Sequence, residues 1–408
     1  MHTLINKYKT YVALFTSVIC YATTPHLHGE VTKDSLQDQL NAGKYEQVLE
    51  QHKGKTSNES LFTQSICELS LSLEDFHQTL YRYGAKAQSR MMGFRINTPL
   101  EENPNPKQVS YEAIRKELEI FHDRLHKEEN LLSQADDKEF NLPLDLAMLR
   151  LDVNEDGIYS DKESNLALIL SLRGGPVGRA SQRPDTIIHF DKSDLLWLRG
   201  YIQITLGLTD IALAHDFKEP FDMISNTIFP KPNNEYNKHL SLDDDWKSVG
   251  NIIATLHLMQ MDVIEPQRLK NAHQHFLNMT KESRIMMKSV MQETDNVREW
   301  IPSPKQDSVT GIKITEEMVK EWENVLIEIE SVLNGEALIP HWRVNSEEKG
   351  INLKRVFHEA KDTDLILWVT GHAATPYFEE GKVIPRATWR RLNRVFGNNL
   401  LGTSFFIN

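Results

Sequence analysis

The chain has 408 residues, of which 40% are hydrophobic and 8% are aromatic. This apolar content is enough for one large core or two ordinary cores, and it excludes an intrinsically disordered protein. The 46 basic and 58 acidic residues give a net charge of −12, so we expect no nucleic-acid partner, because binding to a phosphate backbone requires a basic surface.

The first 22 residues have the layout of a secretory signal peptide. Lys7 and Lys9 precede an apolar run over residues 11–22, and polar, Pro-containing sequence follows. The run is shorter than the roughly 20 apolar residues that a membrane-spanning helix needs. We therefore expect cleavage near Ala22, a periplasmic or secreted protein, and no transmembrane helix in the mature chain. An uncleaved N-terminal anchor is the alternative.

Residues 23–106 predict an N-terminal helical hairpin region that ends in a loop. Two stretches, over residues 33–55 and 60–84, read as short helices with polar breaks, and a Pro- and Asn-rich segment follows over residues 97–106. The pattern from Leu40 to Tyr45 is weakly similar to a tetratricopeptide repeat. One unit is too few for a solenoid, so a hairpin docked on a larger domain fits better.

Residues 107–408 predict one large α-helical domain, because no linker long enough to divide them occurs. Its first helix is amphipathic, with apolar residues at steps of three and four: Tyr111, Ile114, Leu118, Phe121 and Leu125. Residues 194–217 are apolar nearly all round, but Arg199, Gln203 and Asp210 within them are costly in a membrane. This segment therefore predicts a buried central helix, with Ser193 or Asp194 as its N-cap.

Further helical patterns cover residues 245–260, 266–294 and 315–334, and Asn334-Gly335 ends the last of them. The tail is more mixed, with a compact apolar run over residues 364–371 and another over residues 400–408. The fold class predicted is therefore mainly α, with one helix–loop–helix unit (described next) and minor β structure near the C-terminus.

One loop, from Asp152 to Glu163, has the pattern of a calcium ligand set. Oxygen-bearing side chains occupy positions 1, 3, 5, 9 and 12 of the loop, and a glycine at position 6 permits the bend that turns the carbonyl at position 7 inward. The predicted ligands are Asp152, Asn154, Asp156, the carbonyl of Ile158, Ser160 and Glu163, with Gly157 at the bend. This set resembles the EF-hand family, and the resemblance implies bound Ca²⁺ and a short helix on each side of the loop.

Two features limit what the loop implies. Position 8, where a paired EF-hand has an aliphatic residue, is Tyr159, and Ser164 follows Glu163. We find no second such loop in the sequence, so a structural calcium clip is favoured over a sensor. The alternative is a polar turn without metal, since Ser160 and Glu163 also form a capping box.

Other candidate sites have weaker patterns. Glu119, His122, His126 and Glu129 share one face of the amphipathic helix, as zinc ligands would, although such a stripe is more often a solvated rim. His273 and His275 point to different faces and suggest no site. His372, with Glu379 and Glu380 nearby in sequence, permits an acid/base role, but no nucleophile motif accompanies it.

Most of the chain from about Leu73 onward is similar to an uncharacterised family of exported bacterial proteins. The similarity lies in residues 142–157, 194–222, 350–359 and 392–408. It implies export and a long helical body that contains the loop, and it implies no catalytic residue.

Three functions are consistent with these patterns. The first is an exported calcium-binding protein whose ion acts as a structural clip in a binding or scaffold domain, with a protein partner not identified. The second is an exported hydrolase with a site near His372. The third is a calcium-responsive switch.

Overall fold

The computed structural model describes residues 35–86, 88–91, 94–97, 102–165, 186–234, 253, 256–257, 259–309, 313–344, 346–385, 388 and 395. Within these residues the protein is mainly helical, with small two-stranded sheets. The predicted signal peptide, the terminal run over residues 400–408 and most of the predicted helix over residues 245–260 lie outside them.

The described helices are α2 (Leu36–Asn41), α3 (Tyr45–His52), α4 (Asn58–Arg82), α5 (Tyr111–Leu132), α7 (Lys192–Ala214), α8 (Lys218–Ile228), α11 (Pro266–Val290), α12 (Glu316–Leu333), α13 (Leu353–Glu359) and α14 (Leu365–Thr370). Antiparallel pairs join β1 (Gln88–Met91) to β2 (Phe94–Asn97), β3 (Leu142–Leu144) to β4 (Ile188–Phe190), β5 (Gln260–Asp262) to β7 (Asp362–Asp364), and β6 (Lys349–Ile351) to β8 (Phe378–Glu380).

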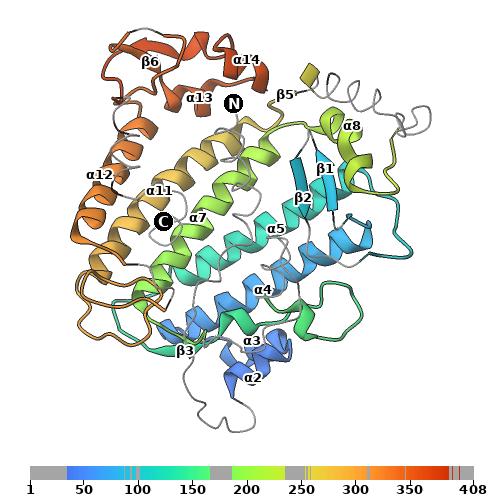
Figure 1. Cartoon of the computed structure of the whole chain (residues 1–408), viewed down its shortest axis with the longest axis vertical. Coiled ribbons are helices and arrows are strands. Elements are labelled where there is room, and N and C mark those ends of the chain that lie inside the picture. The colour runs from blue at the N-terminus through green and yellow to red at the C-terminus, as the bar shows by residue number, and fades with distance from the viewer. Residues whose placement is uncertain are drawn as a thin grey trace.

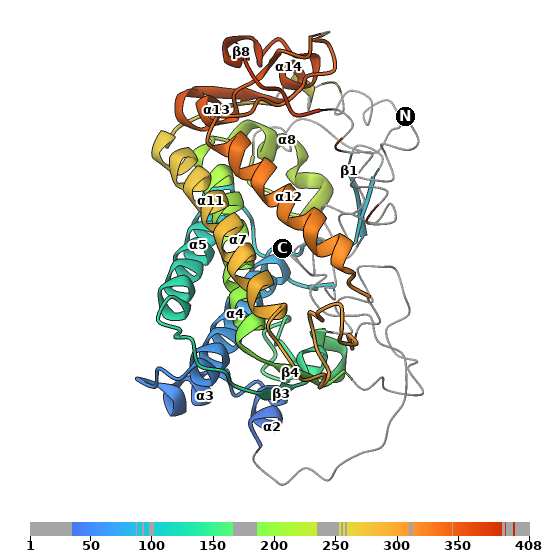
Figure 2. The ribbon, with the colours of Figure 1, turned by 90° about the vertical axis from the view of Figure 1, so that its left-hand side faces the viewer.

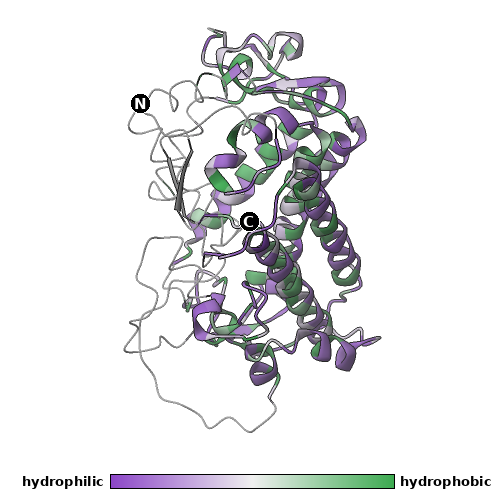
Figure 3. Ribbon diagram, turned by 90° about the vertical axis from the view of Figure 1, so that its right-hand side faces the viewer, coloured by the Kyte–Doolittle hydropathy of each residue, from purple (hydrophilic) through white to green (hydrophobic). Residues whose placement is uncertain are grey.

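The long helices form a serial array. Helix α3 packs on α4, α4 on α5, α5 on α7, α7 on α11, and α11 on α12, so each long helix lies beside its predecessor in the described chain (Figure 1). The helices in Figure 3 carry hydrophobic and hydrophilic residues side by side along their length, as expected for helices with one buried and one exposed face. The predicted amphipathic helix that begins at Tyr111 is confirmed as α5.

Side-chain caps fix where several helices begin. Ser57, Ser110 and Thr315 each accept a hydrogen bond from the backbone N–H three residues later, at the starts of α4, α5 and α12. Each such cap contributes about 1 kcal/mol. Helix α7 begins with a different cap from the one predicted, because Asp191 accepts from the N–H groups of Ser193 and Asp194. The predicted cap Asp194 instead reaches back to the N–H of Asp191, which completes a capping box.

Helix α7 is the buried central helix that the sequence predicts. Helix α7 packs against α5 on one side and α11 on another. It is therefore buried on more than one face, which explains why apolar residues surround it. A Cβ on Gly207 would lie 2.8 Å from the ring of Phe276 in α11. The absent side chain therefore lets these two helices approach closely. No described helix is long and apolar enough to span a membrane.

The N-terminal region is joined to the rest by a common core. It contains α2, α3 and the 25-residue helix α4. Buried residues from Leu40 in α2 to Leu326 in α12 belong to one hydrophobic cluster. Apolar packing of this extent, at about 25 cal/mol per Å² of buried surface, is the main stabilising term.

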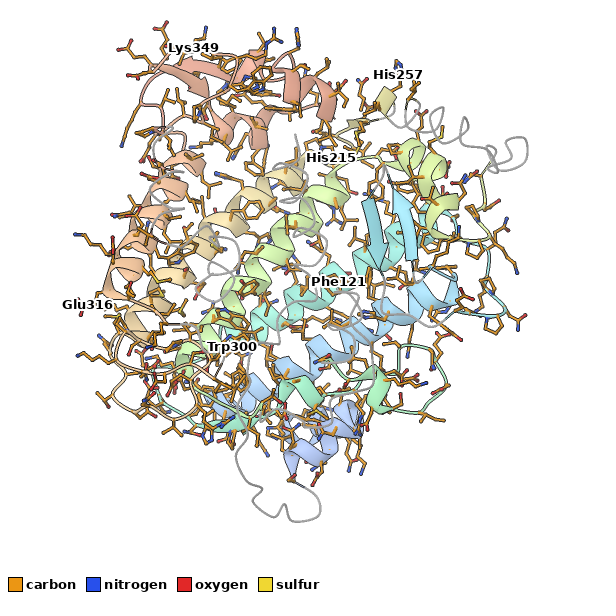
Figure 4. The ribbon with its side chains drawn as sticks, in the orientation of Figure 1. Phe121, His215, His257, Trp300, Glu316 and Lys349 are labelled. Atoms are coloured by element: carbon orange, nitrogen blue, oxygen red, sulfur yellow. The ribbon has the colours of Figure 1, made fainter. Side chains whose placement is uncertain are left out.

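The C-terminal part covers one end of the helical array. Figures 1 and 2 place α13 and α14 beyond the ends of α11 and α12, with β6 beside them in Figure 1, and α13 contacts both of those helices. Figure 4 shows His215 at the same end, at the C-terminus of α7. Its Nε2 lies 2.8 Å from Oγ1 of Thr363 in β7. The minor β structure predicted near the C-terminus is confirmed, whereas the pairs β1–β2 and β3–β4 were not predicted.

Candidate functional site

The loop over residues 152–163 is closed at its base by backbone hydrogen bonds. The N–H of Leu151 donates to the carbonyl of Glu163 at 3.1 Å, and that of Asn165 donates to Leu149 at 2.9 Å. The predicted helix before the loop was wrong: β3 and a single 3₁₀ turn over Leu146–Met148 stand there instead. Residues Leu142–Leu144 pair with β4, and this pairing requires an extended backbone, which is incompatible with a helix. Beyond residue 165, the predicted helix after the loop lies outside the described residues.

The first half of the loop is organised by the side chain of Asp152. Its two carboxylate oxygens accept from the N–H groups of Asp156 at 3.1 Å and Gly157 at 3.0 Å. Asn154 Oδ1 also accepts from the N–H of Asp156, at 3.0 Å. Gly157 has a φ of 76°, a left-handed conformation that glycine adopts without strain. The bend predicted at position 6 of the loop is therefore present.

The second half is organised by Glu163, which is only 6% exposed. One of its oxygens accepts from the N–H of Val153 at 3.2 Å, and the other accepts from the N–H of Ser160 at 3.1 Å and from its hydroxyl at 2.7 Å. Glu163 therefore joins the two ends of the loop and also caps the 3₁₀ turn over Asp161–Glu163. The predicted capping interaction is present.

The remaining predicted ligands lie nearer the solvent. Asp156 accepts from the N–H of Ile158 at 2.7 Å and from the amide of Asn154 at 3.1 Å, while the side chain of Ile158 is 64% exposed. All six predicted ligands therefore belong to one compact loop. In the structure the side-chain oxygens of the three acidic members accept hydrogen bonds within that loop. Their role as calcium ligands stays a prediction.

Helix α4 holds the loop from one side. Glu74 accepts from the N–H of Asp152 at 2.8 Å and from the hydroxyl of Tyr159 at 3.3 Å. Gln78 donates to the carbonyl of Asp152 at 2.7 Å, and Arg82 forms an ion pair with Glu155. Burial, with the Asp152 carboxylate nearby, raises the pKa of Glu74 to about 7. Negative charge is therefore unfavourable at this contact.

The turn between α2 and α3 holds the loop from another side. A Cβ on Gly43 would lie 2.1 Å from the ring of Tyr159, so the aromatic ring packs directly on the backbone. Arg150 donates to the carbonyl of Asn41 at 3.0 Å and pairs with Asp161 at 2.6 Å. The unusual tyrosine at position 8 thus packs within this chain and fastens the loop to α2 and α3.

A partly buried acidic triad lies at the start of α7. Asp191, Glu293 and Glu299 each place a carboxylate oxygen so that all three lie within 4.8 Å of one another. Figure 4 labels Trp300, the residue after Glu299, whose ring lies 5.6 Å from that of Trp197 in α7. The triad could hold a metal ion, whose identity is unknown.

Burial and the repulsion of neighbouring carboxylates raise the pKa values of the triad. Burial, with the charges of Glu299 and Glu139, raises the pKa of Asp191 to about 6. Burial, with the charge of Asp191, raises the pKa of Glu293 to about 8, and burial also raises the pKa of Glu299. Glu139 and Asp295 line the same cavity. The site therefore favours bound protons or a bound cation over free carboxylates.

Sequence reasoning did not identify the triad. Asp191 has the local signature of a helix cap, which it also is, and Glu293 and Glu299 lie in the polar segment after α11. No fixed spacing connects residues from these two segments. Only the packing of α11 on α7 brings them together.

The four residues of the possible zinc stripe on α5 do not meet at one site in the structure. Glu119 pairs with Arg115 at 3.4 Å, and Glu129 pairs with Arg199 at 3.0 Å. The two histidines instead meet residues of other helices, namely Asp210 in α7 and His275 in α11. We call His122, His126, Asp210 and His275 the imidazole cluster.

The imidazole cluster is largely buried. Asp210 is fully buried, with His122 Nε2 at 3.0 Å from its Oδ1 and His275 Nε2 at 3.7 Å from its Oδ2. The ring of His126 lies 4.6 Å from that of His122 and 5.4 Å from that of His275. Burial lowers the pKa of His126, and it lowers that of His275 to about 4. His273 faces away and bonds the carbonyl of Leu333 at 2.7 Å.

The surroundings of His372 give no support to an acid/base centre. The His372 ring is exposed and its Nδ1 lies 3.0 Å from the Thr370 hydroxyl. Glu379 is instead engaged by Asn352 at 2.8 Å and by Arg355 at 3.1 Å. The cavity at the triad is not lined by His372.

In comparisons with known proteins, no family model matches this chain, and no curated protein or solved structure is significantly similar to it.

Proposed function

We propose that this protein is an exported calcium-binding protein in which one ion, held by the loop over residues 152–163, acts as a structural clip. The observation behind this proposal is the position of the loop between two elements. Contacts through Glu74 and Gln78 join it to α4, and contacts through Gly43 and Asn41 join it to the α2–α3 turn. An ion that stiffens the loop would therefore stabilise the junction of three helices.

The charge of the junction favours a cation. Asp152 and Glu163 are both less than 10% exposed, and Glu74 contacts the backbone of Asp152. Three largely buried carboxyl groups thus accept hydrogen bonds from the same short stretch of backbone, where uncompensated charge is costly. Ca²⁺ fits better than Mg²⁺, because it accepts six to eight oxygen ligands in flexible geometry.

A clip is favoured over a calcium-responsive switch. The bend at Gly157 is held by hydrogen bonds that Asp152 and Glu163 accept within the chain. A ligand moves a conformational equilibrium only if it binds the two states differently. In a loop whose shape is held by its own hydrogen bonds, we expect binding to add rigidity. Export is proposed on the apolar run over residues 11–22 that follows two lysines.

Thermal melts of the purified protein in chelator, Ca²⁺ and Mg²⁺ test the proposal. We expect Ca²⁺ to raise the midpoint more than Mg²⁺, since an ion at about 100 times its dissociation constant adds about 2.7 kcal/mol to stability. Glu163→Gln should abolish the increase, because it removes the charged ligand and keeps an oxygen for the cap. The matched control is Glu293→Gln, which alters the acidic triad alone.

The control separates the loop from the triad. If Ca²⁺ stabilises Glu163→Gln as much as the unaltered protein, but does not stabilise Glu293→Gln, the ion binds at the triad and the loop proposal fails. Equal stabilisation by Ca²⁺ and Mg²⁺ would also contradict it.

A further inference from the structure

We propose that the imidazole cluster is a binding site for a transition-metal ion of the zinc class, between α5, α7 and α11. Its ligands would be Asp210, His275 and His126, with His122 as a fourth ligand or as a partner of Asp210. Zinc is bound by histidine nitrogens and carboxylate oxygens in tetrahedral sites, and helix bundles build such sites from facing helices. The cluster is separate from the calcium loop and from the acidic triad.

The hydrogen bonds around His275 determine which of its two ring nitrogens carries the proton. Gln274 donates to Oδ1 of Asn278 at 3.0 Å, and the amide of Asn278 donates to Oε1 of Gln203 at 3.4 Å. These bonds orient the Gln203 oxygen toward Nδ1 of His275, which lies 2.7 Å away. An oxygen there requires a proton on Nδ1 of the neutral ring, so Nε2 presents its lone pair.

That lone pair faces another electron-rich atom. Nε2 of His275 lies 3.7 Å from Oδ2 of Asp210, and this oxygen, on a fully buried side chain, accepts no hydrogen bond from any described residue. Nε2 of His122 is 3.0 Å from Oδ1 of Asp210, but its direction does not make a hydrogen bond. Buried acceptors are rarely left without a partner. A metal ion between Asp210 and His275 supplies one.

Two spacings around Asp210 are close to those of a zinc site. Bond lengths of about 2.0–2.1 Å at tetrahedral angles separate neighbouring ligand atoms by about 3.3 Å. His122 Nε2 lies 3.0 Å from one oxygen of Asp210 and His275 Nε2 lies 3.7 Å from the other, on either side of this value. Among the described residues, the acidic triad is the set with three ligand atoms within 4.8 Å. The cluster is therefore more open, and a bound ion would draw its rings inward.

The surrounding residues have the character of an outer shell. Gln203 fixes the His275 ring through Nδ1, as carbonyl and carboxylate partners do for metal-bound histidines. Arg268 Nη1 lies 3.2 Å from Oδ1 of Asp210 and leaves Oδ2 for a metal. Imidazole ligands select zinc-class ions over calcium, which binds oxygen. The two proposed metal sites therefore differ in specificity.

The test is titration of the chelator-treated protein with Co²⁺, followed by visible absorption, and with Zn²⁺, followed by calorimetry. We expect one equivalent of Zn²⁺ to displace Co²⁺ that has the spectrum of a tetrahedral site. His275→Ala should abolish that spectrum. Gln203→Leu, which removes only the positioning residue, should weaken Zn²⁺ binding about 10–100-fold. Glu163→Gln and Glu293→Gln serve as controls and should bind Co²⁺ and Zn²⁺ at this site unchanged.

His126→Gln is a second variant that is expected to fold, because it replaces a partly exposed ring. Circular dichroism of each metal-free variant checks that it is folded. The proposal is overturned if the unaltered protein binds no Zn²⁺ at micromolar concentration, because the cluster is then a buried ion pair of Asp210 with Arg268. It is also overturned if His275→Ala and His126→Gln, both folded, keep the Co²⁺ spectrum.

Discussion

Two acidic residues show how one side chain serves structure and also lies where a cation would bind. Glu163 joins both ends of its loop and caps a 3₁₀ turn. Asp191 caps α7 and is a member of the acidic triad. A carboxylate has about four lone-pair positions, so hydrogen bonds from N–H groups do not use its full capacity. A capping pattern and a metal ligand are therefore compatible at one residue.

The acidic triad predicts a pH dependence of stability in the metal-free protein. The pKa of Glu293 is raised from about 4.5 to about 8 on folding, so the unfolded chain loses this proton at lower pH than the folded chain does. The titration of Glu293 therefore lowers the free energy of unfolding as the pH rises from 4.5 to 8. Glutamine does not titrate, so Glu293→Gln lacks this loss of stability. In chelator, the difference between the melting midpoints of Glu293→Gln and the unaltered protein should increase over this pH range.

Adding a divalent cation that occupies the triad should reduce this difference at pH 8, because the ion takes the place of the proton. A difference between the two proteins that stays constant from pH 4.5 to pH 8 in chelator would show that Glu293 does not titrate as expected.

At the scale of elements, the turn between α2 and α3 depends on a glycine. Gly43 has a φ of 68° and packs on the ring of Tyr159, which belongs to the loop over residues 152–163. Two constraints act at one position, a left-handed backbone and the absence of a side chain. The sequence feature that departs from the EF-hand pattern, Tyr159, is therefore explained by packing between elements.

Gly43→Ala should destabilise the protein by more than the roughly 1–3 kcal/mol that a left-handed non-glycine residue costs alone, because its Cβ also collides with Tyr159. The matched control is Gly54→Ala, at a φ of 76° with no atom within 4 Å of the new Cβ. Denaturant midpoints measure both. Equal losses of stability would show that the contact with Tyr159 adds nothing.

At the scale of the whole molecule, the helices pack mainly on their neighbours in the chain. The order α3, α4, α5, α7, α11, α12 is both the chain order and the packing order of these helices (Figure 1). The loop over residues 152–163 lies at one end of this series and the imidazole cluster lies in its centre, so an ion at each proposed site would stabilise a different part of the array.

Amide hydrogen exchange tests whether calcium stabilises only the part of the array that contacts the loop. Calcium should slow exchange in α2, α3 and the loop over residues 152–163, since these segments contact each other through Tyr159 and Arg150. Exchange in α12, at the far end of the array, should change little, because local openings occur in separate cooperative units. The Glu163→Gln variant is the control. Uniform slowing across all helices, or none in α2 and α3, would contradict a local clip.

Sequence patterns alone predict the long helices α5, α7, α11 and α12 and the bend of the loop, because both depend on neighbours in the chain. The 25-residue helix α4 is longer than the short helix predicted there. The apolar spacing of Tyr111, Phe121 and Leu125 predicts α5 through the period of a helix. The positions of Asp152 and Gly157 predict the bend, since the bonds that hold it span only a few residues. Where neighbours allow two outcomes, the sequence alone was insufficient, and residues 142–148 became a strand and a 3₁₀ turn.

The residues that meet from different elements follow from helix packing, which no local pattern specifies. The acidic triad joins the start of α7 to the segment after α11, and the imidazole cluster joins three helices. The helical spacing places His122 and His126 on one face of α5, but Glu119 and Glu129 of the same stripe pair with arginines. Asp210 and His275 replace them. Helical periodicity fixes the face on which a residue lies, and only packing fixes which other face it meets.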